Sequence, residues 1–316
     1  MKNRDSFRGT SIDKTFAKSF KKSLFYTDIY KKHKDEIIIG VRDGSVNLYY
    51  NCDSIASIKV RNPQQCNIDK YYTNGKKTCL TEDEMVQYYD IIKENSNKRN
   101  KNEKQSQQRL YIDNNKNKSS KWFCIDVEYT KSLKGKKSAE DWRFDIIAIS
   151  KEKPFRVALI ELKYGFAAIG GTSGIRKHVE DFHKFYRDNK FEILKPELVS
   201  IINKLVMLGV NVPSSLKGLK GEDIATEPEF YFVVLNNNPR GRSKNLPKQT
   251  TSGYLFNDKR WDCKKISKSV TEEGDYYVLI NNDNSFKPVF LFSKATLPDL
   301  QIRDILDNKY YEVETV

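Results

Sequence analysis

Apolar residues recur along the chain in two patterns, and together these predict a protein built of both helices and strands. Short runs rich in Ile, Val and Phe between polar turns are typical of strands, whereas apolar residues three and four positions apart are typical of helices. Residues 12–35 are amphipathic and basic, which predicts a helix, and residues 36–60 contain strand-like runs around Asp43-Gly44, a hairpin-turn pair. This first part of the chain is expected to form a small module of helix and sheet.

A second series of elements starts at Thr81. Thr81 and Glu84 have the spacing of a capping box, in which a hydroxyl and a carboxylate bond the free amides at the start of a helix. Residues 95–120 are rich in Lys, Asn and Gln, so they either prolong this helix or form a linker. Beyond them the pattern predicts three strands, a helical region and a further strand, at 122–130, 142–150, 155–164, 175–208 and 229–235.

The remaining sequence predicts an extension of this core. Residues 241–270 are polar and are expected to form a loop, with strands at 276–281 and 288–293 and a short helix near 298–307. The chain is thus predicted to have an α/β (α+β) fold with a mixed central sheet. Its expected domains are a docking or substrate-binding module, the core, and an extension packed on the core, at 1–80, 81–240 and 241–316.

The strands expected at 142–150 and 155–164 bring charged residues together if they form a hairpin. With Lys153 at the centre of the turn, the numbers of facing residues sum to about 306, so Asp145 lies opposite Glu161. Lys163 is two residues beyond Glu161 and therefore points to the same face. Two carboxylates and one ammonium are expected to converge at one end of a buried hairpin.

This group of charges has the chemistry of a metal-dependent phosphodiesterase. Mg²⁺ prefers hard oxygen ligands and keeps several waters, so two carboxylates leave room for water and a phosphate. A bound metal lowers the pKa of its water and neutralises the charge that builds on phosphorus. The lysine would orient the attacking water, deprotonate it or stabilise the transition state, and the sequence leaves these three roles open.

A structural ion pair is the alternative to a catalytic site. Asp145 and Glu161 are both flanked by apolar residues, and a buried salt bridge often adds little net stability. Pairing of Lys163 with one acid leaves the other acid to be explained, since burial of an unpaired carboxylate is costly. Two acids forced close together favour a cation, so metal binding or catalysis is the preferred interpretation.

The same residues resemble the signature of the PD-(D/E)xK nuclease superfamily, which has the restriction-endonuclease-like fold. Asp145 and Glu161-Leu162-Lys163 match the acid on one core strand and the E-x-K on the next, and the predicted element order matches the αβββαβ core. The resemblance covers roughly half of the chain, and Phe144 stands where the literal signature has Pro. It implies that Asp145 and Glu161 hold Mg²⁺ or Mn²⁺ with the Leu162 carbonyl, and that Lys163 is the catalytic lysine.

The resemblance also implies a further acid, because many members of the superfamily add one from the first core helix. The sequence does not separate three candidates on that helix, Glu84, Glu94 and Glu103. A different candidate is Glu128, since simple alternation along its strand puts Cys124, Asp126 and Glu128 on one face. If this face joins that of Asp145, Glu128 is a catalytic or metal-binding acid; otherwise it belongs to a partly exposed edge strand.

Basic residues flank the expected site and are candidates for contacts with nucleic acid. They lie on the turn before the Asp145 strand, where a solvated charged loop is the alternative, and on the helix after E-x-K. The candidates are Lys131, Lys134, Lys136, Lys137, Arg176, Lys177 and His178. By resemblance, a polar residue of this helix often faces the active site; His178 is expected to do so and His183 to face solvent.

The overall charge agrees with a polyanionic partner. Lys and Arg total 56 and Asp and Glu 42, which gives a net charge of +14 and a pI of about 9.3. This balance favours nucleic acid first and an anionic membrane surface second, although a Lys- and Asn-rich chain also arises from genomic base composition. The five cysteines include no CxxC pair, so neither a zinc site nor a disulfide framework is supported.

These observations predict a cytoplasmic Mg²⁺- or Mn²⁺-dependent nuclease that hydrolyses phosphodiester bonds, with DNA favoured over RNA. No membrane association is expected, because no apolar run reaches the length of a bilayer span and the N-terminus lacks the apolar core of a signal peptide. The resemblance implies a role in restriction or anti-phage defence, as a homodimer or with a protein partner. The alternative function is a non-catalytic nucleic-acid-binding or sensor subunit that retains the fold.

Overall fold

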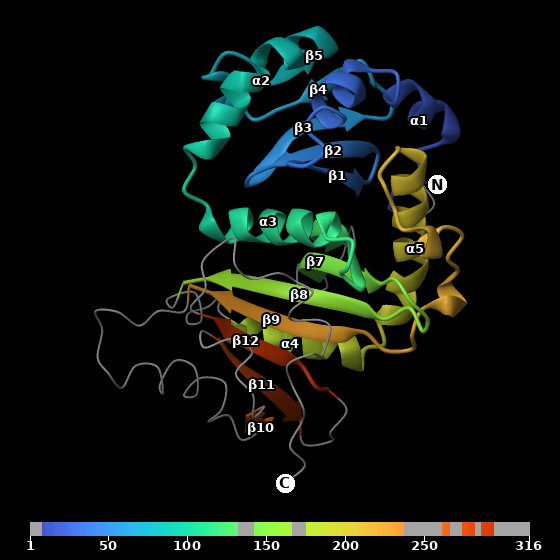
Figure 1. Ribbon diagram of the computed structural model, residues 1–316, viewed down its shortest axis with the longest axis vertical. Helices are drawn as coiled ribbons and strands as arrows, with labels where there is room; N and C mark the ends of the chain where they lie inside the picture. Colours follow the sequence, from blue (N-terminus) through green and yellow to red (C-terminus); the bar gives the residue numbers. More distant parts are fainter. Residues whose placement is uncertain are drawn as a thin grey trace, which may run out of the picture. The chain divides into compact units, whose positions relative to one another are not determined.

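The computed structural model describes residues 8–131, 142–165, 175–236, 261–265, 274–281 and 286–293. It has a mixed α/β architecture and divides into two compact units, each with its own sheet (Figure 1). Unit 1 comprises the chain up to residue 118 together with 194–223, and unit 2 comprises 119–193 and the chain from residue 224 onward.

Unit 1 is built on an antiparallel sheet that has five strands in the described residues, in the order β1-β2-β3-β4-β5. The predicted Asp43-Gly44 turn joins the first two strands, where Arg42 pairs with Ser45. Gly44 has a positive φ of 72°, which glycine adopts without strain. The strands are β1 (Ile37–Arg42), β2 (Ser45–Tyr50), β3 (Asp53–Lys59), β4 (Gln65–Asn67) and β5 (Cys79–Thr81).

The helices of unit 1 include the one predicted to begin at Thr81. Its capping box is present, because the Glu84 amide donates to the Thr81 hydroxyl and the Thr81 amide donates to the Glu84 carboxylate. The polar stretch at 95–120 is the end of this helix, α2, followed by a second helix, α3. The helices are α1 (Lys14–Phe20), the π-helix η1 (Phe25–Tyr30), α2 (Glu82–Asn97), α3 (Asn102–Lys116), most of α5 (Phe191–Met207), and the 3-10 helices η2 (Lys70–Thr73), η5 (Ser214–Leu216) and η6 (Gly221–Asp223).

Unit 2 contains a mixed sheet whose described strands have the order β10-β11-β12-β9-β8-β7-β6. β6, β7 and β8 form an antiparallel meander, and β9 runs parallel to both β8 and β12. Parallel neighbours need a long crossover, and α4 (Ile175–Arg187) lies in the connection from β8 to β9. The strands are β6 (Trp122–Lys131), β7 (Trp142–Ser150), β8 (Val157–Tyr164), β9 (Glu229–Leu235), β10 (Trp261–Lys265), β11 (Gly274–Asn281) and β12 (Val289–Ser293).

Aromatic rings pack α4 against this sheet. The ring centroid of Phe182 lies 5.2 Å from that of Phe144 on β7 and 5.0 Å from that of Phe232 on β9. One turn further along α4, Phe185 meets Trp142 edge-on at 5.1 Å. Such ring pairs stabilise beyond the area they bury. They hold α4 against one face of the sheet, and in Figure 1 it is seen behind β9 and next to β12.

The predicted elements largely agree with the described ones. The strands expected at 122–130, 142–150 and 229–235 are β6, β7 and β9, and both late strands are present as β11 and β12. The prediction of a loop throughout 241–270 is wrong at β10, and the helix predicted at 12–35 is divided into α1 and η1. The helix expected near 298–307 lies outside the described residues. No helix in the described ranges is both long and apolar enough to cross a membrane.

The two units group the chain differently from the predicted domain ranges. The boundary expected at residue 80 falls between β5 and α2, which both belong to unit 1 because α2 packs on β5 and η2. Strands β10, β11 and β12 are hydrogen-bonded into the same sheet as β6 to β9. The described strands of the C-terminal segment are therefore part of the core sheet.

Two cysteines on neighbouring strands provide a test of this arrangement. Cys66 on β4 is buried, and burial raises the pKa of its thiol to about 12, whereas Cys79 on β5 is exposed. Because the thiolate is the reactive form, we expect iodoacetamide at pH 8 to label Cys79 and to leave Cys66 at least ~1,000-fold slower. Peptide mass spectrometry over a time course measures both rates. Equal rates in the folded protein would contradict the fold of unit 1, and equal rates in denaturant are the control.

Candidate functional site

The hairpin of β7 and β8 has the predicted register. Ile146 pairs with Ile160, and all four pairs of the ladder keep the sum of facing residue numbers at 306. The ladder ends at this pair. Asp145 and Glu161 occupy the next positions on their strands, at the end of the hairpin that is remote from the turn.

At this end a side chain takes the place of the backbone as hydrogen-bond acceptor. The Leu162 amide donates to Oδ2 of Asp145 at 2.8 Å. A carboxylate that accepts from a backbone N–H forms a strong, charge-assisted hydrogen bond. The partly exposed Asp145 side chain is thereby fixed against the middle residue of the E-x-K motif, which is fully buried.

Glu161 and Lys163 form a buried ion pair on β8. Nζ of Lys163 lies 2.6 Å from Oε1 of Glu161, and the two side chains are only 11% and 3% exposed. They point to the same face, as their two-residue spacing predicts. Removing both charges from water is costly, so a pair of this kind contributes little to net stability unless further groups satisfy it.

α4 contributes a further polar group to the same carboxylate. Nε2 of His178 lies 3.1 Å from Oε1 of Glu161, the oxygen that Lys163 also contacts. Phe182, one turn further along the same helix face, holds α4 on the sheet and so sets this distance. His178 therefore faces Glu161, as expected. His183, expected to face solvent, is partly exposed and packs on Phe286, with the ring centroids 5.1 Å apart.

Glu128 on β6 has a backbone conformation that is rare for its residue type. Its φ is 52°, in the left-handed region, which costs an L-residue about 1–2 kcal/mol. The ladder pairs on either side of it put Glu128 level with Asp145. Both strands therefore depart from regular pairing at the same level. Strained backbone of this kind is concentrated at functional sites.

The regular alternation predicted for β6 is wrong. The β6–β7 register shifts between Cys124 and Asp126, which pair with Ala148 and Ile147. Because neighbouring residues of β7 point to opposite faces, Cys124 and Asp126 do so too. This bulge, with one extra residue in β6, sets the register that brings Glu128 level with the site.

Of the three acids expected from the first core helix, Glu84 and Glu94 have local partners. All three lie on helices of unit 1, Glu84 and Glu94 on α2 and Glu103 on α3. Glu84 bonds Lys77 as well as the capping box, and Glu94 pairs with Lys98 at 2.6 Å. Glu128 is the candidate acid that shares a sheet with Asp145.

The basic residues expected to contact nucleic acid are only partly described. Nζ of Lys131 lies 5.6 Å from the ring centroid of Trp142, and Lys177 is exposed and pairs with Asp181 on α4. Both leave an amine near the surface of unit 2. Lys134, Lys136, Lys137 and the side chain of Arg176 lie outside the described residues.

The oxygen donors beside the E-x-K motif fit a hard cation in chemical type. Asp145 and Glu161 have carboxylate oxygens and Leu162 a carbonyl, and Mg²⁺ commonly takes one or two carboxylates with several waters. Among the described residues, no group of three or more His, Cys, Asp or Glu side chains is placed to hold a metal. A metal here would therefore depend on these two carboxylates, the carbonyl and water.

No protein-family model, curated protein or solved structure matches the chain. The resemblance to the PD-(D/E)xK superfamily consequently depends on the motif and on the order of the elements. The site is therefore judged on its own geometry.

The strain at Glu128 predicts a difference between two truncations. Glu128→Gly and Glu128→Ala both remove the carboxylate, but only glycine adopts the left-handed conformation without cost. We expect the glycine variant to be more stable than the alanine variant by about 1 kcal/mol. Chemical denaturation of the two variants measures this difference. An alanine variant that is equally stable or more stable would contradict the assigned φ.

The ion pair on β8 predicts that its two residues are energetically coupled. Glu161→Gln removes a charge 2.6 Å from the Lys163 ammonium, and we expect the free energy of unfolding to fall by about 3 kcal/mol. Lys163→Met in the same chain should recover part of this loss, because no ammonium is then buried beside a neutral amide. A double-mutant cycle by denaturation measures the coupling, and strictly additive effects would contradict it.

Proposed function

We propose that the chain is a metal-dependent nuclease that hydrolyses phosphodiester bonds, most readily those of DNA. The observation that carries this proposal is that the side chains of Asp145, Glu161 and Lys163 lie together at one end of the β7–β8 hairpin. Asp145 is bonded to the Leu162 amide, and Glu161 is paired with Lys163. The site resembles that of the PD-(D/E)xK nucleases in having an acid on one strand and E-x-K on the next. Here the Leu162 amide also hydrogen-bonds the acid.

The order of elements in unit 2 supports the same proposal. An antiparallel meander, β6-β7-β8, is followed by α4 and by β9 parallel to β8. This order matches the βββαβ part of a restriction-endonuclease-like core, which we propose as the fold of unit 2. Function belongs to sites and not to folds, so the order of elements supports the proposal only together with the charged residues.

In the proposed site, Asp145 and Glu161 hold Mg²⁺ or Mn²⁺ together with the Leu162 carbonyl. When bound, such an ion supplies an activated water and neutralises charge on the scissile phosphate. Lys163 supplies a positive charge beside the carboxylates, suited to orient the attacking water or to stabilise the transition state. His178 contacts Oε1 of Glu161 and so restricts the rotamer of that carboxylate.

The net charge of the chain supports a nucleic-acid substrate. An excess of 14 positive charges attracts a polyanion and speeds its encounter with the protein. Duplex DNA carries the closely spaced phosphates that such a charge neutralises. The pairing of a basic chain with an acidic, metal-suited site favours phosphodiester hydrolysis over chemistry on an uncharged substrate.

Metal-dependent cleavage tests this proposal. The full chain is incubated with supercoiled plasmid, linear DNA and RNA, with Mg²⁺, with Mn²⁺ or with EDTA. We expect cleavage only with metal, and a loss of about 100-fold or more in the rate with Asp145→Asn or Lys163→Met. Cleavage is followed on gels as the conversion of supercoiled plasmid.

Matched controls come from the opposite end of the same hairpin. Glu152→Gln and Lys153→Met make the same chemical changes at exposed positions of the β7–β8 turn, and we expect wild-type rates. Equal activity in site variants and wild type would overturn the proposal. Nucleic-acid binding without cleavage under any metal condition would assign the chain to the non-catalytic alternative.

A further inference from the structure

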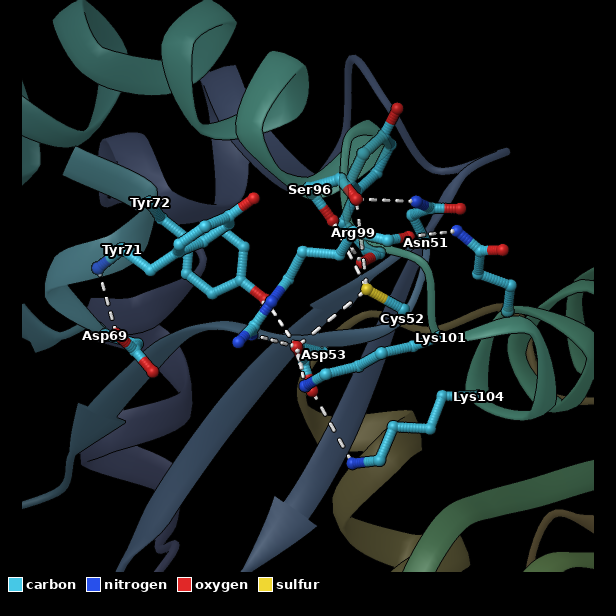
Figure 2. A network of polar contacts seen from close by, with 12 residues as sticks. Asn51, Cys52, Asp53, Asp69, Tyr71, Tyr72, Ser96, Arg99, Lys101 and Lys104 are labelled. Carbon is cyan, nitrogen blue, oxygen red and sulfur yellow. Dashed lines mark hydrogen bonds and ion pairs between the residues drawn. The ribbon is translucent and has the colours of Figure 1, made fainter. Parts of the chain in front are cut away.

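A cluster of charged and aromatic side chains surrounds Asp53 in unit 1, a part of the chain in which no sequence motif indicates chemistry. Asp53 begins β3, and three cations from the turn between α2 and α3 and from the start of α3 converge on its carboxylate (Figure 2). Arg99 Nη1 and Lys101 Nζ each lie 2.6 Å from Oδ2, and Lys104 Nζ lies 3.5 Å from Oδ1. The members are far apart in sequence, so no local motif indicates them.

The polypeptide around Asp53 is held firmly in place. Asn51, in the turn between β2 and β3, donates to the Ser96 carbonyl of α2 at 3.1 Å, and the Ser96 hydroxyl donates to the Tyr50 carbonyl at 3.3 Å. On the other side of the cluster, Gln105 of α3 donates to the Arg99 carbonyl at 3.0 Å. The cations are therefore presented on an ordered framework, which lowers the entropic cost of binding a ligand.

Asp53 remains ionised in this setting. Burial opposes the charge, but hydrogen bonds from Lys101 and from the Tyr72 hydroxyl outweigh it and lower the pKa of the carboxyl. The Tyr72 bond is 2.6 Å long, and Arg99 donates to the same hydroxyl at 3.0 Å. One negative charge therefore faces three positive charges, and the cluster carries an excess of two positive charges.

The cations are more exposed than the carboxylate that gathers them. The side chain of Asp53 is 14% exposed, whereas those of Lys101 and Lys104 are 35% and 40% exposed. Arg99 has five N–H donors, and within the described residues its side chain donates through Nη1 only. Asp53 thus gathers the cations, and the side chains of Lys101 and Lys104 stay partly exposed.

An exposed aromatic ring borders the same cations. Tyr71 is 40% exposed, and the guanidinium carbon of Arg99 lies 4.5 Å from its ring centroid. Tyr72 meets the Tyr71 ring edge-on at 5.4 Å. Cations interleaved with an exposed ring are typical of surfaces that bind nucleic acid, where lysine and arginine contact phosphates and rings contact sugars or bases.

We propose that Arg99, Lys101, Lys104 and Tyr71 form a binding patch for the phosphodiester backbone of nucleic acid on unit 1. Lys101 and Lys104, three residues apart at the start of α3, and the Arg99 guanidinium match the spaced negative charges of a nucleic-acid strand. A membrane surface is a poorer match, because membrane-binding segments combine lysines with an apolar face that inserts into the lipid. Among the described residues, the exposed apolar surface beside the cations is that of Tyr71, which is too small to form such a face.

This patch is independent of the proposed nuclease chemistry, because it lies on unit 1 and needs no metal. Binding is therefore measured in EDTA on the full chain, by fluorescence anisotropy of a labelled DNA duplex at several salt concentrations. We expect Lys101→Gln with Lys104→Gln to weaken binding about tenfold at 0.1 M salt and to reduce the slope of log K against log salt by about 2. Glu152→Gln, at the exposed β7–β8 turn of unit 2, should leave both quantities unchanged.

The matched control removes two lysines elsewhere in unit 1. Lys217→Gln with Lys220→Gln makes the same change in net charge at exposed positions, and we expect it to change the slope much less. Equal slopes for the two double variants would overturn the patch, since general charge would then explain binding. Lys101→Arg with Lys104→Arg keeps the charges and should restore wild-type binding; a loss equal to that of the glutamine pair would also overturn it.

The same variants are tested on vesicles containing an anionic lipid. If the glutamine pair loses vesicle binding and keeps wild-type affinity for DNA, the patch belongs to a membrane-binding surface and the proposal is overturned. Circular dichroism of each variant confirms that the fold is retained.

Discussion

The Lys163 ammonium and the Glu161 carboxylate lie 2.6 Å apart on a strand whose other residues are buried and largely apolar. Neither charge is stable there alone, because an unpaired ion buried in protein costs several kcal/mol. The surrounding elements accommodate this requirement. α4 lies close enough for His178 to reach the same carboxylate, and the aromatic contacts of Phe182 keep it there. The aromatic packing of unit 2 therefore also sets the positions of the charged groups in its candidate site.

Much of this arrangement follows from short-range sequence rules. The register of the β7–β8 hairpin follows from the position of its turn, and the shared face of Glu161 and Lys163 follows from strand alternation. The capping box at Thr81 is equally local. The details of the site are not local. Three details depend on how one strand pairs with the next: the bulge in β6, the left-handed backbone of Glu128, and the hydrogen bond from the Leu162 amide to Asp145. The residue pattern of a single strand does not predict them.

The two units handle charge in different ways. In unit 2 a carboxylate and an ammonium neutralise one another away from water. In unit 1 one carboxylate gathers three cations near the surface and leaves an excess of positive charge. The Asp53 cluster could not be predicted from the sequence, because its members come from β3, η2, α3 and the turn between α2 and α3. Only the tertiary fold brings them together.

The hydrogen bond between Asp145 and Leu162 makes one backbone amide sensitive to the state of one side chain. The Leu162 N–H lies beyond the last pair of the β7–β8 ladder, yet its exchange with solvent is slowed for as long as the carboxylate accepts its proton. Its resonance in a nitrogen–proton spectrum would therefore move when Asp145 is protonated, substituted or drawn toward a cation. This single amide would make the chain its own spectroscopic probe of the candidate site, without any added label.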